Sequence, residues 1–268
     1  MKLAATRFVE LLGTWEDSQG GLADASRRLV AAEVNPVLAE QTAGLLHDDA
    51  AAADVAVDYP QYGGLTTTDA SVMTLLTQHL LLLDGSTVER QVVLDVRLGR
   101  ATADEPWQVT AVGPDPDTTV VGDVSPAAQQ VLSNPNLRLP EPAVRDIEEG
   151  RMDDSLLGLL NGLAADHVLD LHVLYRGHPT NVFDTERASN HSVGRAFDIW
   201  RIDDQLVVDP DTPDDLIAAV MVKAAALGAT EIGGPFDVNG ERPGFFTDQV
   251  HQDHIDVGVS PGRPPAMP

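Results

Sequence analysis

The sequence predicts an α+β protein made of two domains, and three observations lead to this prediction. Residues 1–113 show helical spacing of apolar side chains, followed by a run of β-rich segments. Residues 124–268 alternate helical and strand patterns along the chain. Between them, residues 114–123 are rich in proline and aspartate and follow neither periodicity, which is typical of a linker.

The first domain is expected to place helices before an antiparallel meander. Apolar residues fall at helical spacing over residues 3–12 and 24–46. Two β-rich runs then flank Asp84 and Gly85, a dipeptide typical of tight hairpin turns, and a third strand is expected over 107–112. This order predicts a cone-like α+β domain, similar to nuclear-transport-factor-like and SnoaL-like domains. It carries no nucleophile, metal or phosphate motif, so we expect an accessory role in packing or in binding a protein partner.

The second domain is expected to mix helices with a central antiparallel sheet. Ser125 followed by Pro126 is typical of a helix start, because the hydroxyl can cap the first turn and proline suits its first position. Helices are predicted to begin near residues 125, 140, 153 and 213, and strands over 167–175, 195–202 and 253–259. The proline-rich end, PGRPPAMP, is expected to fray.

The charge of the chain excludes several classes of function. The sequence holds 42 Asp and Glu against 17 Lys and Arg, a net charge of −25, and its only lysines are Lys2 and Lys223. Binding nucleic acid or an anionic membrane takes clustered basic residues, so neither partner is expected. Acidic residues are spread over both domains, which predicts a soluble surface rather than a binding site.

The residue types that are missing narrow the chemistry further. There is no cysteine, so thiolate metal sites and cysteine nucleophiles are excluded, and any metal must bind His, Asp or Glu. No apolar run approaches the roughly 18 residues of a membrane span, so membrane insertion is not expected. Glu10 interrupts the first apolar stretch, so this chain is expected to carry no export signal.

Two histidine- and aspartate-bearing segments of the second domain are the candidates for chemistry. His191 and Asp198 stand seven positions apart around Gly194, which allows a tight turn through which both side chains can meet one metal ion. Near the end of the chain, His254 and Asp256 are two residues apart on an expected strand and therefore share a face. His251 precedes them at the entrance of that strand and can overlook the same place.

These segments resemble the zinc D-Ala-D-Ala metallopeptidases, within the superfamily that also holds lysostaphin-type enzymes and hedgehog domains. Their signature, S-x-H-x-x-G-x-A-x-D, is matched by Ser189, His191, Gly194, Ala196 and Asp198. The resemblance covers residues 124–268 and implies the sheet of that family. It also implies one zinc ion per chain with His191 and Asp198 as ligands. Part of the superfamily has a second signature, H-x-x-H-x-H.

The second signature departs from the family at its last position. His251 and His254 match its first two histidines and are expected in catalysis, but Asp256 stands at the third-ligand position. Asp is a permitted zinc ligand, yet two carboxylates cancel the charge of the ion and weaken its action on water and carbonyl groups. Three outcomes stay open: a His/Asp/Asp site with Asp256 as ligand, a site in which His254 becomes the third ligand with His251 as base, or a degenerate site.

The resemblance implies a zinc peptidase that cleaves D-amino-acid-containing peptidoglycan stem peptides, as a carboxypeptidase or an endopeptidase. Arg176 and Ser189 are expected at the substrate, with Ser189 alternatively bracing the histidine loop. The same resemblance implies a location in the cell envelope or outside the cell. The alternative is a non-catalytic binding or structural module that keeps the fold and has lost turnover through Asp256.

Overall fold

The computed structural model describes residues 1–113, 122–240 and 242–267, and it is a mixed α+β structure. The chain divides into two compact units, Met1–Pro116 and Asp117–Pro268. Most of the expected linker, residues 114–121, lies outside the described residues. Each unit has a hydrophobic core of its own.

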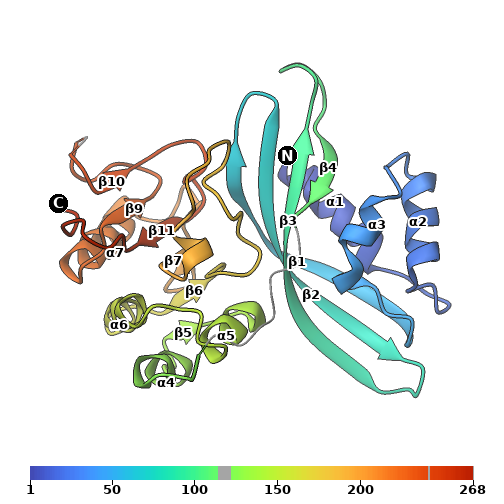
Figure 1. Cartoon of the computed structure of the whole chain (residues 1–268), viewed down its shortest axis with the longest axis horizontal. Coiled ribbons are helices and arrows are strands. Elements are labelled where there is room, and N and C mark those ends of the chain that lie inside the picture. The colour runs from blue at the N-terminus through green and yellow to red at the C-terminus, as the bar shows by residue number, and fades with distance from the viewer. Residues whose placement is uncertain (114–121, 241, 268) are drawn as a thin grey trace. The chain divides into compact units, whose positions relative to one another are not determined.

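The first unit begins with helices that cover one face of a sheet (Figure 1). Helix α1 spans Lys2–Gly13, α2 spans Leu22–Ala31, α3 spans Leu38–Gln41, and a short 3-10 turn follows at Ala43–Leu45. The helical pattern predicted over 24–46 is therefore interrupted. Glu33 takes a left-handed backbone with φ of 60°, and Pro36 follows, so one continuous helix cannot form there.

The four-stranded antiparallel sheet follows in simple meander order (Figure 1). Its strands are β1 (Ala50–Leu65), β2 (Asp69–Leu82), β3 (Thr87–Gly99) and β4 (Gln108–Val112). Strands β2 and β3 pair on either side of the predicted turn, where Gly85 has φ of 86°, as a tight hairpin requires. The hairpin and the third strand predicted around it are confirmed, whereas β1 was not predicted.

The core of this unit joins the helices to the sheet. Phe8 and Leu12 of α1 are buried with Val72 and Leu76 of β2, and burying a side chain of this size stabilises a fold by about 1.5–3 kcal/mol. The amide of Gln78 donates to the carbonyl oxygens of Gly13 (3.0 Å) and Leu45 (3.1 Å). The side chain thus satisfies carbonyl groups at two helix ends that would otherwise lack partners.

A second polar group in this core is the carboxylate of Asp95, which is 5% exposed. Its Oδ1 accepts a hydrogen bond from Ser71 Oγ at 2.5 Å, and its Oδ2 accepts one from Arg97 Nε at 2.6 Å. Burial raises the pKa of Asp95, while the charge of Arg97 and these hydrogen bonds act in the opposite direction. This cluster is closed, with donors within hydrogen-bond distance of both carboxylate oxygens.

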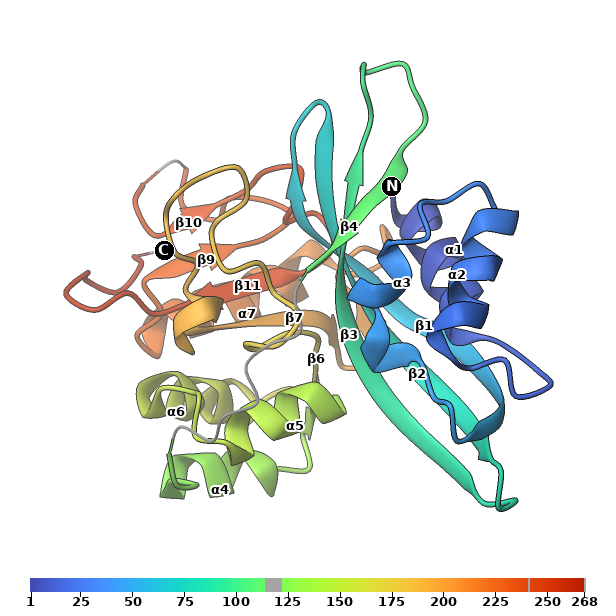
Figure 2. The same cartoon turned by 45° about the vertical axis from the view of Figure 1, so that its right-hand side comes forward.

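The second unit combines a mixed sheet with helices, of which α4, α5 and α6 group together (Figures 1 and 2). The sheet has the order β10-β9-β11-β7-β6-β5, with β8 paired to β7, and its central pairs β9-β11, β11-β7 and β7-β6 are antiparallel. The helices are α4 (Pro126–Leu132), α5 (Glu141–Glu148), α6 (Asp154–Leu163) and α7 (Asp214–Ala226). The strands are β5 (Leu137–Arg138), β6 (Leu169–Leu171), β7 (Ala196–Ile202), β8 (Gln205–Leu206), β9 (Glu231–Gly233), β10 (Phe245–Phe246) and β11 (Ile255–Gly258).

Local sequence accounts for several of these boundaries. Ser125 Oγ accepts a hydrogen bond from Ala128 N at 3.1 Å and caps α4 as predicted. The end of the chain differs from expectation, because the tail does not simply fray. Ala266 is 5% exposed, and its N–H donates to Ala229 O at 2.8 Å. The proline-rich segment is therefore tied to the end of the α7–β9 connection.

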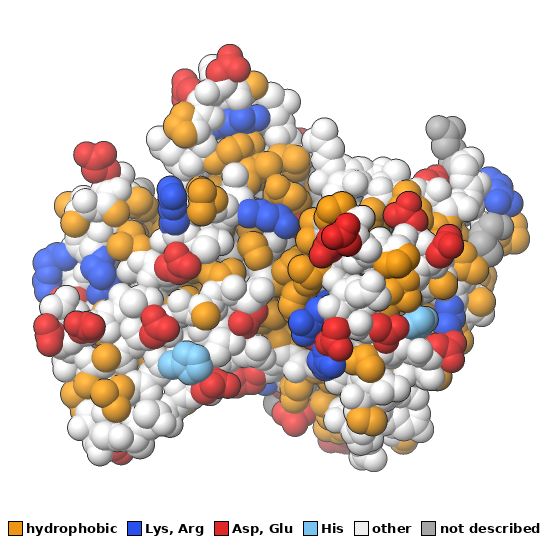
Figure 3. Space-filling view, turned by 180° about the vertical axis from the view of Figure 1, so that it is seen from behind, with side chains coloured by type: hydrophobic (Ala, Val, Ile, Leu, Met, Phe, Trp, Pro, Cys, Tyr) orange, Lys and Arg blue, Asp and Glu red, His pale blue; other side chains and the backbone are white. Residues whose placement is uncertain are grey.

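Acidic side chains are scattered over the face shown in Figure 3, with basic side chains among them. On this face, the acidic side chains do not gather in one patch. Among the described residues, no helix has both the length and the apolar character needed to cross a membrane.

Candidate metal centre

The signature residues meet where strands β7 and β11 pair. Asp198 of β7 and Asp256 of β11 are direct cross-strand partners, so their side chains leave the same face of the sheet. Like charges placed directly opposite each other are destabilising, and the pair therefore requires positive charge nearby. His191 approaches from a single 3-10 turn, His191–Val193, that immediately precedes β7.

Gly194 makes the approach of His191 possible. It ends the 3-10 turn in the left-handed region, with φ of 71°. A Cβ atom at this position would lie 1.9 Å from the carbonyl oxygen of Arg151, and the oxygen of Gly194 accepts a hydrogen bond from Asp153 N at 2.9 Å. Only glycine allows this conformation and this close approach without moving the backbone of the α5–α6 connection.

Imidazole Nε2 atoms face the two carboxylates at distances longer than that of a charge-assisted hydrogen bond. His191 Nε2 lies 3.3 Å from Asp198 Oδ1 and 3.5 Å from Asp256 Oδ1. His251 Nε2 lies 3.8 Å from Asp256 Oδ2, and His254 Nε2 lies 4.0 Å from Asp198 Oδ1. A direct hydrogen bond between imidazolium and carboxylate would be about 2.7–2.9 Å.

The Nδ1 atoms of the same rings make close contacts on the side away from the carboxylate pair. Their partners are Leu174 O for His191 (2.7 Å), Asp248 Oδ1 for His251 (2.8 Å) and Asp253 Oδ1 for His254 (2.6 Å). Each Nδ1 faces an acceptor and therefore carries the hydrogen. In the neutral rings, Nε2 is then the atom with a free lone pair, which is how metal-binding histidines are usually fixed.

The donor set fits a metal ion. Two ligands bound at about 2.0–2.1 Å in a tetrahedral site lie about 3.3 Å apart, close to the separation between His191 Nε2 and Asp198 Oδ1. Among the described residues, the buried Oδ1 of Asp256 makes no hydrogen bond. Carboxylate oxygens and imidazole lone pairs that face one another need a cation between them. That cation is either a metal ion or protons carried by the imidazoles.

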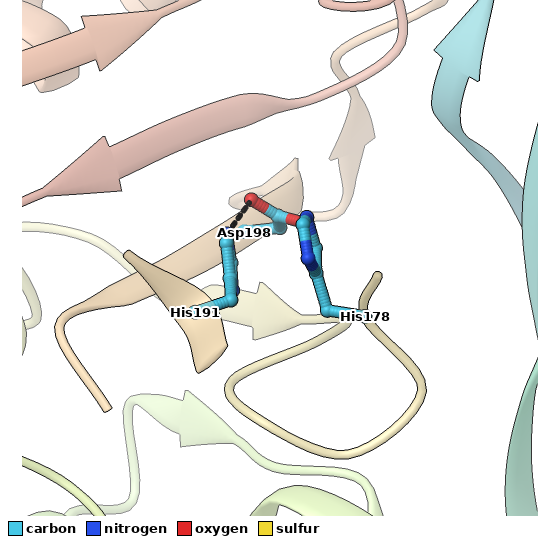
Figure 4. A group of neighbouring side chains, drawn as sticks. All are labelled: His178, His191 and Asp198. Atoms are coloured by element: carbon cyan, nitrogen blue, oxygen red, sulfur yellow. Dashed lines mark ion pairs between the residues drawn. The ribbon is translucent and has the colours of Figure 1, made fainter. Parts of the chain in front are cut away.

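His178 completes a group that lies close enough to hold a metal ion. The ligand atoms of His178, His191 and Asp198 are all within 4.8 Å of one another, and Figure 4 shows the two rings face to face beside the carboxylate. The rings of His178 and His191 are stacked, 4.0 Å apart and 8° from parallel. Parallel rings point their lone pairs along parallel lines rather than at one ion, so this stack favours His191 as the ligand and His178 as a cover over it.

Charges in the site set the protonation of the metal-free protein. Burial lowers the pKa of His191, but the negative charges of Asp198 and Asp256 outweigh it and raise the pKa to about 10. His251 also reaches about 10, because Asp248 and Asp256 overcome its burial. His178 has no such support: burial and the charge of His191 lower its pKa to about 3. Without metal, His191 and His251 therefore carry the compensating protons.

The two residues expected at the substrate are both engaged with the scaffold. The guanidinium of Arg176 is buried and pairs with Asp146 at 2.5 Å and with Glu149. Ser189 Oγ accepts a hydrogen bond from His191 N at 3.2 Å and thereby braces the histidine turn. A role of either side chain toward substrate stays a prediction.

Sequence reasoning missed two carboxylates that orient the rings. Asp248 and Asp253 precede His251 and His254 by three residues and one residue, but aspartates are so common in this chain that neither spacing stood out. His178 belongs to neither of the two signatures. Its stacking on His191 depends on the fold of residues 177–190, which show no periodic pattern of apolar side chains.

Comparison with models of known families, with curated proteins and with solved structures finds no match to this chain. The resemblance to the D-Ala-D-Ala metallopeptidases therefore rests on the signature residues alone and stays a prediction.

Proposed function

We propose that this protein is a zinc-dependent peptidase that cleaves D-amino-acid-containing peptidoglycan stem peptides, as a carboxypeptidase or an endopeptidase. The observation that carries the proposal is the contrast between the two sides of the imidazole rings. Nδ1 atoms lie at hydrogen-bond distance from their acceptors, whereas Nε2 atoms stand 3.3–4.0 Å from the carboxylates, which leaves room for an ion. The substrate class follows from the S-x-H-x-x-G-x-A-x-D resemblance.

We infer that His191, Asp198 and His254 hold the zinc ion. The His254 side chain is 3% exposed, and its Nδ1 is fixed by the buried Asp253, an arrangement typical of zinc-binding histidines. Asp256, which the family pattern places at the third-ligand position, is 24% exposed and faces His251 as well. Two imidazoles and one carboxylate leave a formal charge of +1 on the site, which favours catalysis over the neutral alternative.

Zinc bound in such a site acts as a Lewis acid, which polarises the scissile carbonyl and makes water more acidic. His251 and Asp256, which are not among the three proposed ligands, then have separate roles. His251 Nε2, which lies 3.8 Å from Asp256 Oδ2, would accept the proton of the attacking water. Asp256 keeps negative charge beside this ring and stabilises the imidazolium that forms when His251 takes a proton. Cleavage of wall peptides would place the protein in the cell envelope or outside the cell.

The test is zinc content and peptide cleavage measured on the same purified full-length chain. We expect about one zinc per chain, release of products from muropeptides, loss of both on chelation, and recovery when zinc is returned. His191→Ala should abolish both. His167→Ala is the matched control, because His167 pairs with Asp203 at 2.7 Å without any contact to the carboxylate pair.

The carboxylate at position 256 favours a second candidate, a metal-binding module without turnover, because a second negative charge at the ion weakens it as a Lewis acid. Zinc bound at one per chain with no cleavage of any stem peptide would support this candidate. A chain that binds no zinc when zinc is supplied contradicts both.

A further inference from the structure

The proposed function needs the ring of His251 to present one particular nitrogen, and Asp248 is placed to achieve this. Asp248 Oδ1 lies 2.8 Å from His251 Nδ1. The same oxygen accepts backbone hydrogen bonds from Val250 N (2.7 Å) and His251 N (3.0 Å). The carboxylate is therefore fixed by the turn it belongs to before it contacts the ring, and it cannot rotate away without losing both backbone contacts.

Two neighbouring strands confine the ring from other directions. The ring of Phe246, in β10, meets His251 edge to face, with centroids 4.8 Å apart and planes at 85°. The backbone of Gly233, in β9, lies so close that a Cβ atom there would be 2.7 Å from His251 Cδ2. The position and plane of the imidazole are thus set by packing, and the contact with Asp248 keeps a hydrogen on Nδ1.

The opposite nitrogen of the ring faces the metal centre. His251 Nε2 lies 3.8 Å from Asp256 Oδ2, and the ring of His254 is tilted beside it with centroids 5.1 Å apart. Asp248 is 48% exposed and stands on the far side of the ring from Asp256. The two carboxylates therefore bracket one imidazole, one at each nitrogen, and only the one at Nδ1 is at hydrogen-bond distance.

We propose that Asp248 is a positioning residue that fixes His251 in the Nδ1–H form and thereby keeps Nε2 as the proton acceptor at the metal centre. This rests on the proposed peptidase function. During hydrolysis, the oxygen of water bonds to the carbonyl carbon and His251 Nε2 takes a proton from that water. The same proton passes to the amine nitrogen as the C–N bond breaks, so His251 ends each turnover neutral. Asp248 keeps its charge throughout and stabilises the imidazolium.

The test combines a spectroscopic readout with kinetics on the full chain. In wild type we expect the His251 Nδ1–H proton as a downfield resonance by nitrogen-edited NMR, with and without zinc, because this hydrogen is present in both cases. Asp248→Ala should abolish the resonance, leave zinc content unchanged and lower kcat by about 100-fold or more with little change in KM. The matched control is Asp209→Ala, because Asp209 Oδ1 accepts from Asp211 N at 2.9 Å in a similar turn that holds no histidine.

Asp248→Asn separates the hydrogen-bond acceptor from the charge. Asn keeps an oxygen able to accept from Nδ1–H, so we expect the resonance to persist and the loss of kcat to be smaller than in Asp248→Ala. The proposal is overturned if the resonance survives in Asp248→Ala, or if Asn costs as much kcat as Ala. It is also overturned if zinc content falls in Asp248→Ala, because His251 would then be a ligand. Because the resonance is read without metal, a chain that never binds zinc overturns the peptidase while still testing this contact.

Discussion

Asp95 in the first unit and Asp198 in the second are both buried carboxylates, with exposed fractions of 5% and 1%, and their surroundings differ. The carboxylate of Asp95 accepts hydrogen bonds from Ser71 Oγ at 2.5 Å and from Arg97 Nε at 2.6 Å. Asp198 Oδ1 faces His191 Nε2 at 3.3 Å and carries a pKa of about 2, because the charges of His191 and His254 overcome its burial. Burial of charge therefore does not by itself mark a functional site. In the second unit, His191, Asp198 and His178 instead lie close enough together to hold a metal ion.

The largest expected effect is the loss of zinc affinity when His254, the third proposed ligand of the metal centre, is removed. His254→Ala should lower zinc affinity by more than about 100-fold, because losing even an outer-shell partner costs about 10- to 100-fold. Asp256→Asn should retain zinc within about 10-fold and lose cleavage. Isothermal titration with zinc measures both variants. If Asp256→Asn loses zinc while His254→Ala keeps it, the His/Asp/Asp site is correct and the ligand set proposed above is wrong.

Zinc itself should stabilise one unit and leave the other unchanged. An ion present at 100 times its dissociation constant stabilises the folded state by about 2.7 kcal/mol, or about 5–11 °C in Tm for a unit of this size. Calorimetry with and without zinc should show this shift in the transition of the second unit alone. A shift of the first unit's transition of similar size would contradict a site confined to residues 117–268.

A change in the Asp95 cluster of the first unit should show the reverse pattern, altering the stability of that unit without altering zinc binding. Asp95→Asn removes the charge that pairs with Arg97, and we expect the first unit to lose about 1–3 kcal/mol of stability, since Arg97 is 31% exposed and water replaces part of the contact. Zinc affinity should be unchanged. Chemical denaturation of this variant provides the stability, and the same titration as above provides the affinity.

The smallest expected effect is the release of protons when zinc binds, and it reports on the protonation of His191 in the metal-free protein. The pKa of His191 rises to about 10 against an unfolded value near 6.5, so its contribution to stability is full below pH 6.5 and is lost as pH rises through about 10. At pH 8 the metal-free protein holds this proton, and zinc must displace it. Titrations in two buffers of different ionisation enthalpy should show at least one proton released per zinc. Zinc binding without proton release would contradict His191 as a ligand.

The sequence predicted those parts of the fold whose local chemistry is strong. The Asp84-Gly85 hairpin and the Ser125 cap formed as expected because each depends on neighbouring residues alone. The 16-residue strand Ala50–Leu65 was missed. Its alanines favour helix, and Pro60 argues against a strand. Yet β1 is an edge strand with register shifts, one of them between Val57 and Tyr59, where such residues are tolerated.

The candidate site, like the fold, was predicted from the sequence only in part. His191, Asp198, His251, His254 and Asp256 were chosen from spacing and are brought together by the β7–β11 pair. What spacing could not supply was the direction of each ring. The role of each histidine depends on which ring nitrogen faces the carboxylate pair. That is decided by Nδ1 contacts with Leu174 O, Asp248 and Asp253, which form only in the folded chain.

The left-handed glycine at the histidine turn has a consequence for the order in which the site assembles. Gly194 is pressed against Arg151 O and bonded to Asp153 N, so the turn that carries His191 takes its shape from the connection between α5 and α6, some 40 residues earlier in the chain. The native position of His191 therefore depends on a contact with a segment that is distant in the sequence. We therefore expect zinc to bind the second unit after it has folded rather than to nucleate its folding.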